Sequence, residues 1–315
     1  MNGTRRDFCI NLLDDAPERG LDPEGIAARF VRYFNVPARP TMEQLTVLLE
    51  ETEFGTVTGQ CRESLDVKGI HFSSPNGGYD IHYREDLWEG SKEHTVLHET
   101  YEIIDETLCE LYSGAVPPRR VCWQADRFAA AALMPPDMFS LFAETSGFDA
   151  VALQEMYQRA YSSVAIRLAE VMRHQPLLAV LYEHRERGDP RLWPSSTLGD
   201  FTAKVVARTP GFRIRMQRRP LSYLRGMLPR RGTPPAPGSV AERVILTGRP
   251  VYVERVSGYD LWQNDDLTVA ARPVLWYGRV AKIAIVAVPH RDRSVLAPQL
   301  GHTCFERIPH AHQVL

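Results

Sequence analysis

Two histidines and two glutamates stand at intervals of four residues: His94, His98, Glu102 and Glu106. Residues four apart lie on the same face of an α-helix. A helix over this segment therefore carries one stripe of imidazole and carboxylate groups, which are common metal ligands in proteins. The spacing predicts a site for a divalent metal ion on this helix.

Within that stripe, His98, Glu99 and Glu102 form the motif HExxE. In zinc hydrolases with the related motif HExxH, the two histidines bind Zn²⁺ and the glutamate acts as general base on a water molecule. A carboxylate in place of the second histidine also binds zinc, at about 2.0–2.2 Å. We expect His98 and Glu102 to be metal ligands and Glu99 to be the catalytic base. The same residue types also occur on charged, solvated helices without a metal, and that interpretation stays open.

A zinc site of this kind needs a third protein ligand from a neighbouring element. Cys122 begins the next apolar segment, and a thiolate binds zinc at about 2.3 Å. Asp126 is either a fourth ligand or the partner of a ligating histidine. We expect His94 to be an auxiliary ligand, an oxyanion donor or a surface residue.

The helices that must position these residues have clear boundaries in the sequence. Residues 22–53 predict two helices, and Thr41 with Gln44 predicts a capping box at the start of the second. Residues 54–86 alternate as strands do, with a hairpin turn at Asn76-Gly77. A long helix is expected from about 92 to 111, and an alanine-rich helix from 122 to 134, which Pro135-Pro136 ends.

Two further segments extend the pattern. Residues 125–135 read ADRFAAAALMP, and residues 161–168 read YSSVAIRL. Together with HExxE, in this order and spacing, they resemble the ImmA/IrrE family of metallopeptidases over about residues 25–173. That family pairs an HExxH helix with a following helix of the form ExxA(N/D)xFAxxL(L/M)P.

The resemblance implies a zincin-like, zinc-dependent metallo-endopeptidase. His98 matches the first zinc ligand of the family and Glu99 its catalytic glutamate. Glu102 stands where the family has its second histidine, and Cys122 stands where it has a glutamate ligand. The resemblance also implies a protein substrate, because family members cleave helix-turn-helix transcriptional repressors in stress or mobile-element responses.

The chain changes character after Pro176. We expect an α+β protein with a metallopeptidase domain over residues 1–175, including a helix-turn-helix-like segment at 149–173. Residues 176–315 are expected to form a mostly β domain of the GAF or PAS type, which is typical of sensory modules. Between Ala203 and Ala241 there are nine Lys or Arg and no acidic residue. This tract indicates either a solvated linker or a contact with nucleic acid or an acidic partner.

Composition limits the function classes. Of 315 residues, 44% are apolar and 24% charged, which excludes a disordered chain or a rod. The five scattered cysteines and the absence of a secretory signal or a long apolar run predict a cytoplasmic protein with no membrane contact. The alternative to a peptidase is a non-catalytic transcription regulator with a degenerate metal site and DNA-binding helices. A third interpretation is a sensor in which the second domain binds a small molecule.

Overall fold

The computed structural model describes residues 3–15, 22–75, 78–113, 122–186, 188–193, 196–212, 229–256 and 266–309. The expected turn at Asn76-Gly77 and five arginines of the basic tract, at 213–225, lie outside these residues. The chain divides into two compact units, Met1–Pro136 and Asp137–Leu315. Each unit is described by itself.

Unit 1 contains five helices and three strands in its described residues. The helices are α1 Arg5–Asp15, α2 Pro23–Tyr33, α3 Met42–Glu51, α4 Glu89–Ser113 and α5 Cys122–Leu133. The strands are β1 Gly55–Gln60, β2 Gly69–Ser73 and β3 Tyr79–Arg84.

Side chains cap the first turns of α2 and α3. The Asp22 side chain accepts a hydrogen bond from the backbone of Gly25 at the start of α2. Thr41 and Gln44 form the expected capping box at the start of α3. Helix α4 begins earlier than expected, at Glu89, so Ser91 lies within its first turn.

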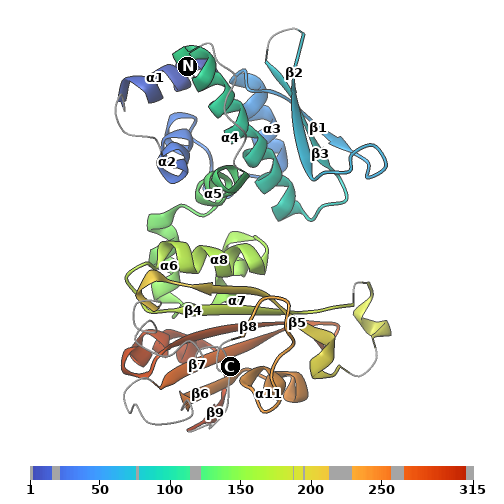
Figure 1. Ribbon diagram of the computed structural model, residues 1–315, viewed down its shortest axis with the longest axis vertical. Coiled ribbons are helices and arrows are strands. Elements are labelled where there is room, and N and C mark those ends of the chain that lie inside the picture. The colour runs from blue at the N-terminus through green and yellow to red at the C-terminus, as the bar shows by residue number, and fades with distance from the viewer. Residues whose placement is uncertain are drawn as a thin grey trace. The chain divides into compact units, whose positions relative to one another are not determined.

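The small sheet of unit 1 has β3 at its centre, paired parallel to β1 and antiparallel to β2. Helix α4 packs on this sheet (Figure 1). At Gly69 the approach is so close that an added Cβ would lie 2.3 Å from Cγ2 of Thr95 on α4. A residue without a side chain is therefore required where β2 meets α4.

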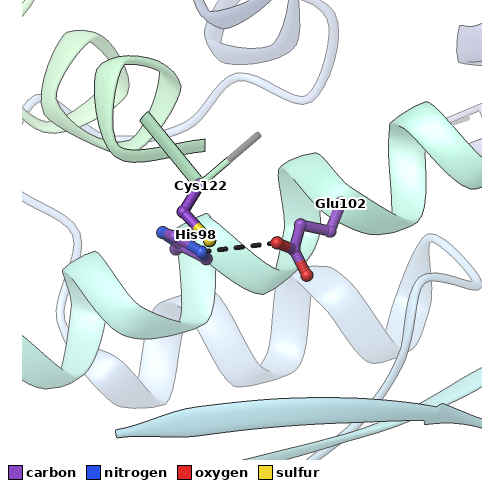
Figure 2. Close-up of side chains that lie close together, drawn as sticks. All are labelled: His98, Glu102 and Cys122. Carbon is purple, nitrogen blue, oxygen red and sulfur yellow. Dashed lines mark ion pairs between the residues drawn. The ribbon is translucent and has the colours of Figure 1, made fainter. Parts of the chain in front are cut away.

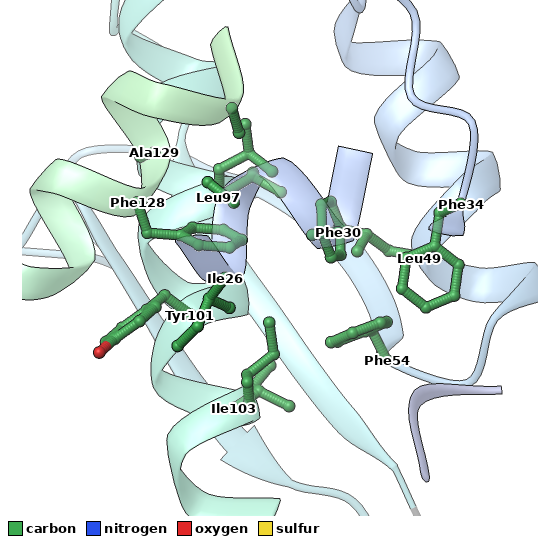
Figure 3. Close-up of a cluster of buried hydrophobic side chains, with 14 of the residues drawn as sticks. Ile26, Phe30, Phe34, Leu49, Phe54, Leu97, Tyr101, Ile103, Phe128 and Ala129 are labelled. Atoms are coloured by element: carbon green, nitrogen blue, oxygen red, sulfur yellow. The ribbon is translucent and has the colours of Figure 1, made fainter. Parts of the chain in front are cut away.

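Aromatic residues from helices α1, α2, α4 and α5 and from strand β3 contribute to the core of unit 1, part of which Figure 3 shows. The Phe30 ring of α2 lies 5.5 Å from the Phe128 ring of α5 and 5.7 Å from the ring of Phe54. Buried alanines line the inner side of α5, and small side chains allow helices to approach closely. This packing fixes α5 against both α2 and α4.

Unit 2 has a six-stranded sheet in the order β5-β4-β8-β7-β6-β9, antiparallel except for the pair β6–β9. The strands are β4 Leu178–His184, β5 Phe201–Arg208, β6 Val251–Val256, β7 Leu267–Trp276, β8 Arg279–Pro289 and β9 Glu306–Ile308. The helices are α6 Pro136–Thr145, which starts at the last residue of unit 1, and α7 Ala150–Tyr157, α8 Tyr161–Val171, α11 Val240–Thr247 and α12 Ala297–His302. Short 3₁₀ turns occupy Pro190–Leu192, Leu198–Asp200 and His290–Leu296.

Both faces of this sheet are covered. Along β4, Leu178, Val180 and Tyr182 face a core shared with α11, whereas Ala179 and Leu181 face a cluster with Ala165 of α8. Strands β7 and β8 join through Tyr277 and Gly278, whose φ angles of 50° and 77° suit a tight hairpin turn. The expected β-rich second part of the chain is confirmed.

Helices α7 and α8 cover the expected helix-turn-helix-like segment, and they belong to unit 2. Val164, Ala165, Arg167 and Leu168 are buried, and α8 packs against β4 and β5. Unit 2 begins at Asp137, ahead of the boundary expected near residue 175, and it includes α8, which covers an apolar face of the sheet. One face of α8 in this segment is therefore part of the packing of unit 2.

Among the described helices, none has the length and apolar character that a membrane crossing requires.

Candidate metal centre

The three expected metal ligands meet at the contact between α4 and α5. One donor atom each from His98, Glu102 and Cys122 lies within 4.8 Å of the other two, and the side chains point toward one another (Figure 2). Nε2 of His98 is 3.5 Å from Oε1 of Glu102. Ligand atoms on one tetrahedral Zn²⁺, at about 2.0–2.3 Å from the ion, lie roughly 3.3–3.6 Å apart. The distance between His98 and Glu102 therefore suits two ligands of one metal ion.

The local structure explains why these donors converge. His98 and Glu102 are one helical turn apart on α4, and Cys122 is the first residue of α5. The Phe128 ring, further along α5, lies 5.4 Å from the ring of Tyr101 on α4. Buried packing between the two helices thus holds the cysteine above the imidazole–carboxylate pair.

Asp126 orients His98. Its Oδ1 is 3.0 Å from Nδ1 of His98, on the opposite side of the ring from Glu102. Although burial opposes it, hydrogen bonding to Asp126 and Glu102 raises the pKa of His98 to about 10. The hydrogen bond with His98 lowers the pKa of Asp126. A metal ion would take the place of the proton on His98, and of the two roles expected for Asp126 the geometry matches that of histidine partner.

His94 belongs to neither group of converging metal-ligand side chains in the described part of the chain. It does lie near the site, because its charge contributes to the low pKa of Asp126. His94 therefore acts on the site through its charge.

Glu99 lies beside the metal-ligand group, with its side chain 8% exposed. One of its carboxylate oxygens lies within 4.8 Å of a carboxylate oxygen of Glu102. Oε2 of Glu99 is 2.8 Å from Nδ1 of His71, and Oε1 faces Gly69. The carboxylate therefore borders both the expected metal site and strand β2.

His71 on β2 is a site residue that the sequence analysis did not select. Its side chain is 1% exposed, and its Nε2 is 3.3 Å from Oε1 of Glu106. The signal was present in the alternation of residues 69–73, which places His71 on the same face of the strand as Gly69. Since Gly69 touches α4, His71 must face α4 as well.

No family model and no curated protein matches this chain. Among solved structures, the fold is similar to that of a Mycobacterium tuberculosis transcriptional regulator, with a TM-score of 0.56 and 14% sequence identity. The match covers 94% of this chain and 83% of that one. At this identity the likeness concerns the fold. The resemblance to ImmA/IrrE metallopeptidases stays a hypothesis that rests on the sequence motifs.

Proposed function

We propose that this chain is a transcription regulator whose unit 1 binds a divalent metal ion through His98, Glu102 and Cys122. The convergence of these three donors from two helices carries the metal part of the proposal. A thiolate, an imidazole and a carboxylate are donors that suit Zn²⁺. The regulatory part is supported by a fold shared with a transcriptional regulator along nearly the whole chain.

Cobalt titration of the full-length, chelator-treated protein tests the metal site. Cobalt bound by Cys122 should give a thiolate-to-metal charge-transfer band. The band should disappear in Cys122→Ala and His98→Ala and persist in Cys304→Ala, whose cysteine is also exposed. A band that survives Cys122→Ala would exclude this ligand set.

Transcript profiling tests the regulatory part. Cells carrying His98→Ala should show the same changes in transcript levels as cells lacking the gene. An unchanged profile in the deletion strain would contradict the regulatory role. A normal profile in His98→Ala would show that regulation does not depend on metal binding.

A second candidate function, peptide-bond hydrolysis, is favoured by the position of Glu99 beside the ligands. A metal ion in this site would supply Lewis acidity. Glu99 would take up a proton from water and deliver it to the leaving amine. The carboxylate of Glu102 and the thiolate of Cys122 donate more negative charge than the histidine and glutamate of the family at these positions, which makes the metal a weaker Lewis acid. By resemblance, the substrate would be a helix-turn-helix repressor.

The test of hydrolysis uses a co-expressed repressor of that type. Glu99→Gln should retain the ion held by His98, Glu102 and Cys122 and lose cleavage, whereas Glu110→Gln, an exposed glutamate near the end of α4, should cleave normally. Cleavage that continues in Glu99→Gln would contradict the role of general base.

The proposal for unit 2 is a sensory role of the GAF or PAS type. It is supported by a sheet covered on both faces, by α8 on one and α11 on the other.

DNA contact belongs to the regulator proposal as well. A gel-shift assay with promoter fragments of the regulated genes tests it, and the absence of any shift would contradict it.

A further inference from the structure

The carboxylate of Glu102 faces two histidines, one with each oxygen. Oε1 is 3.5 Å from Nε2 of His98, and Oε2 is 3.8 Å from Nδ1 of His71. We propose that His71, Glu99 and Glu102 form a second cation site, which shares Glu102 with the site of His98 and Cys122. This inference holds whether or not the chain cleaves peptides.

The distances within this second group fit a shared ion. Nδ1 of His71 is 2.8 Å from Oε2 of Glu99 and 3.8 Å from Oε2 of Glu102. Nitrogen and oxygen ligands of one tetrahedral ion lie roughly 3.3 Å apart, and the two distances bracket that value. The 2.8 Å contact is a hydrogen bond, and a cation would replace its proton after a shift of a few tenths of an ångström.

The two groups have the same construction. His98 has Glu102 on one nitrogen and Asp126 on the other. His71 has Glu99 and Glu102 on one nitrogen and Glu106 on the other. A ligating histidine generally gives its second nitrogen to a carboxylate, which fixes the ring and raises its basicity. Glu106 is therefore the carboxylate partner of the second nitrogen of His71, as Asp126 is for His98.

Burial and charge favour a cation in the second group. The exposed fractions are 1% for the side chain of His71, 8% for Glu99 and 11% for Glu102. Glu99, Glu102 and Glu106 lie around the His71 imidazole, and Glu102 also faces His98. Buried charges are generally paired or bound to a metal ion. A divalent cation supplies two positive charges at this position.

The chemical class of the cation follows from the donors. One imidazole and two carboxylates suit Zn²⁺, Mn²⁺ or Fe²⁺. A carboxylate that gives one oxygen to each of two ions is a feature of two-metal sites, in which the ions lie about 3.5–4 Å apart. The second site therefore makes unit 1 a two-metal unit, with Glu102 as the bridging ligand.

Metal counting in the full-length protein tests the proposal. Chelator-treated protein is titrated with Co²⁺ and desalted, and bound metal is measured by mass spectrometry. Two equivalents per chain are expected, and only one of them should develop together with the thiolate charge-transfer band of Cys122. His71→Ala should bind one equivalent and keep the band. His82→Ala, a histidine on the neighbouring strand β3, should still bind two.

Saturation of the wild-type protein at one equivalent would overturn the proposal, as would an unchanged count in His71→Ala. The wild-type titration decides the question even if His71→Ala does not fold. Two equivalents without any peptide cleavage would contradict hydrolysis and leave the second site intact. Cleavage by a wild-type protein that binds only one equivalent of metal would support hydrolysis and contradict the second site.

Discussion

Nδ1 of His98 and Oδ1 of Asp126 lie 3.0 Å apart, which turns the other ring nitrogen of His98 toward Glu102. Asp126→Asn weakens this contact and should lower metal affinity by about 10–100-fold, the usual effect of removing such a partner. Competition with a chromophoric chelator measures the change. Asp66→Asn, at an exposed aspartate of the same unit, serves as the control. An affinity equal to that of the wild type would show that Asp126 does not support the site.

Metal binding should protect Cys122 from alkylation. Cys61, Cys122 and Cys304 are all exposed, so all three should react with iodoacetamide in the metal-free protein. A metal-bound thiolate is tied up as a ligand and becomes a poorer nucleophile. With saturating Zn²⁺, peptide mass spectrometry should find label on Cys61 and Cys304 and little on Cys122. Equal labelling of all three with zinc present would argue against ligation by Cys122.

Cys9 should make unit 1 sensitive to alkaline pH. Burial raises the pKa of this thiol from 9.0 to about 12. A raised pKa adds stability that is complete below the unfolded value and is lost as the pH rises from about 9 toward 12, at up to ~1.4 kcal/mol per pH unit. Cys9→Ala should flatten this part of the pH dependence of the unfolding free energy. Urea unfolding between pH 8 and 11 measures both proteins, and parallel curves would contradict the role of Cys9.

Gly69 should tolerate no side chain. An added Cβ would lie 2.3 Å from Cγ2 of Thr95, and overpacking of this kind costs about 1–3 kcal/mol. Gly69→Ala should therefore lower the free energy of unfolding by that amount and weaken metal binding, since β2 and α4 must separate. Gly59→Ala is the matched control, because its Cβ would meet only the flexible side chain of Glu85. Denaturant unfolding decides, and equal stability of the two variants would contradict the close packing.

The sequence predicted what depends on neighbours along the chain. The capping box at Thr41 and the pairing of His98 with Glu102 on one helix face follow from local spacing, and the structure contains them. Cys122 was placed near them correctly because it starts the next helix.

The sequence did not predict what depends on tertiary pairing. The contact of His71 with Glu99 joins residues 28 positions apart through the register of β2 against α4. Likewise, no local pattern shows that α8 packs on a sheet formed by residues beyond it in the chain. Both features depend on segments that meet only in the folded protein.

Because Cys122 lies on α5 and His98 and Glu102 on α4, an ion held by all three would act as a cross-link between helices. Its binding energy would add to the folding energy of unit 1, by about 2.7 kcal/mol when the free ion is at 100 times its dissociation constant. Metal supply in the cell would then set how long this half of the protein survives before proteases reach it.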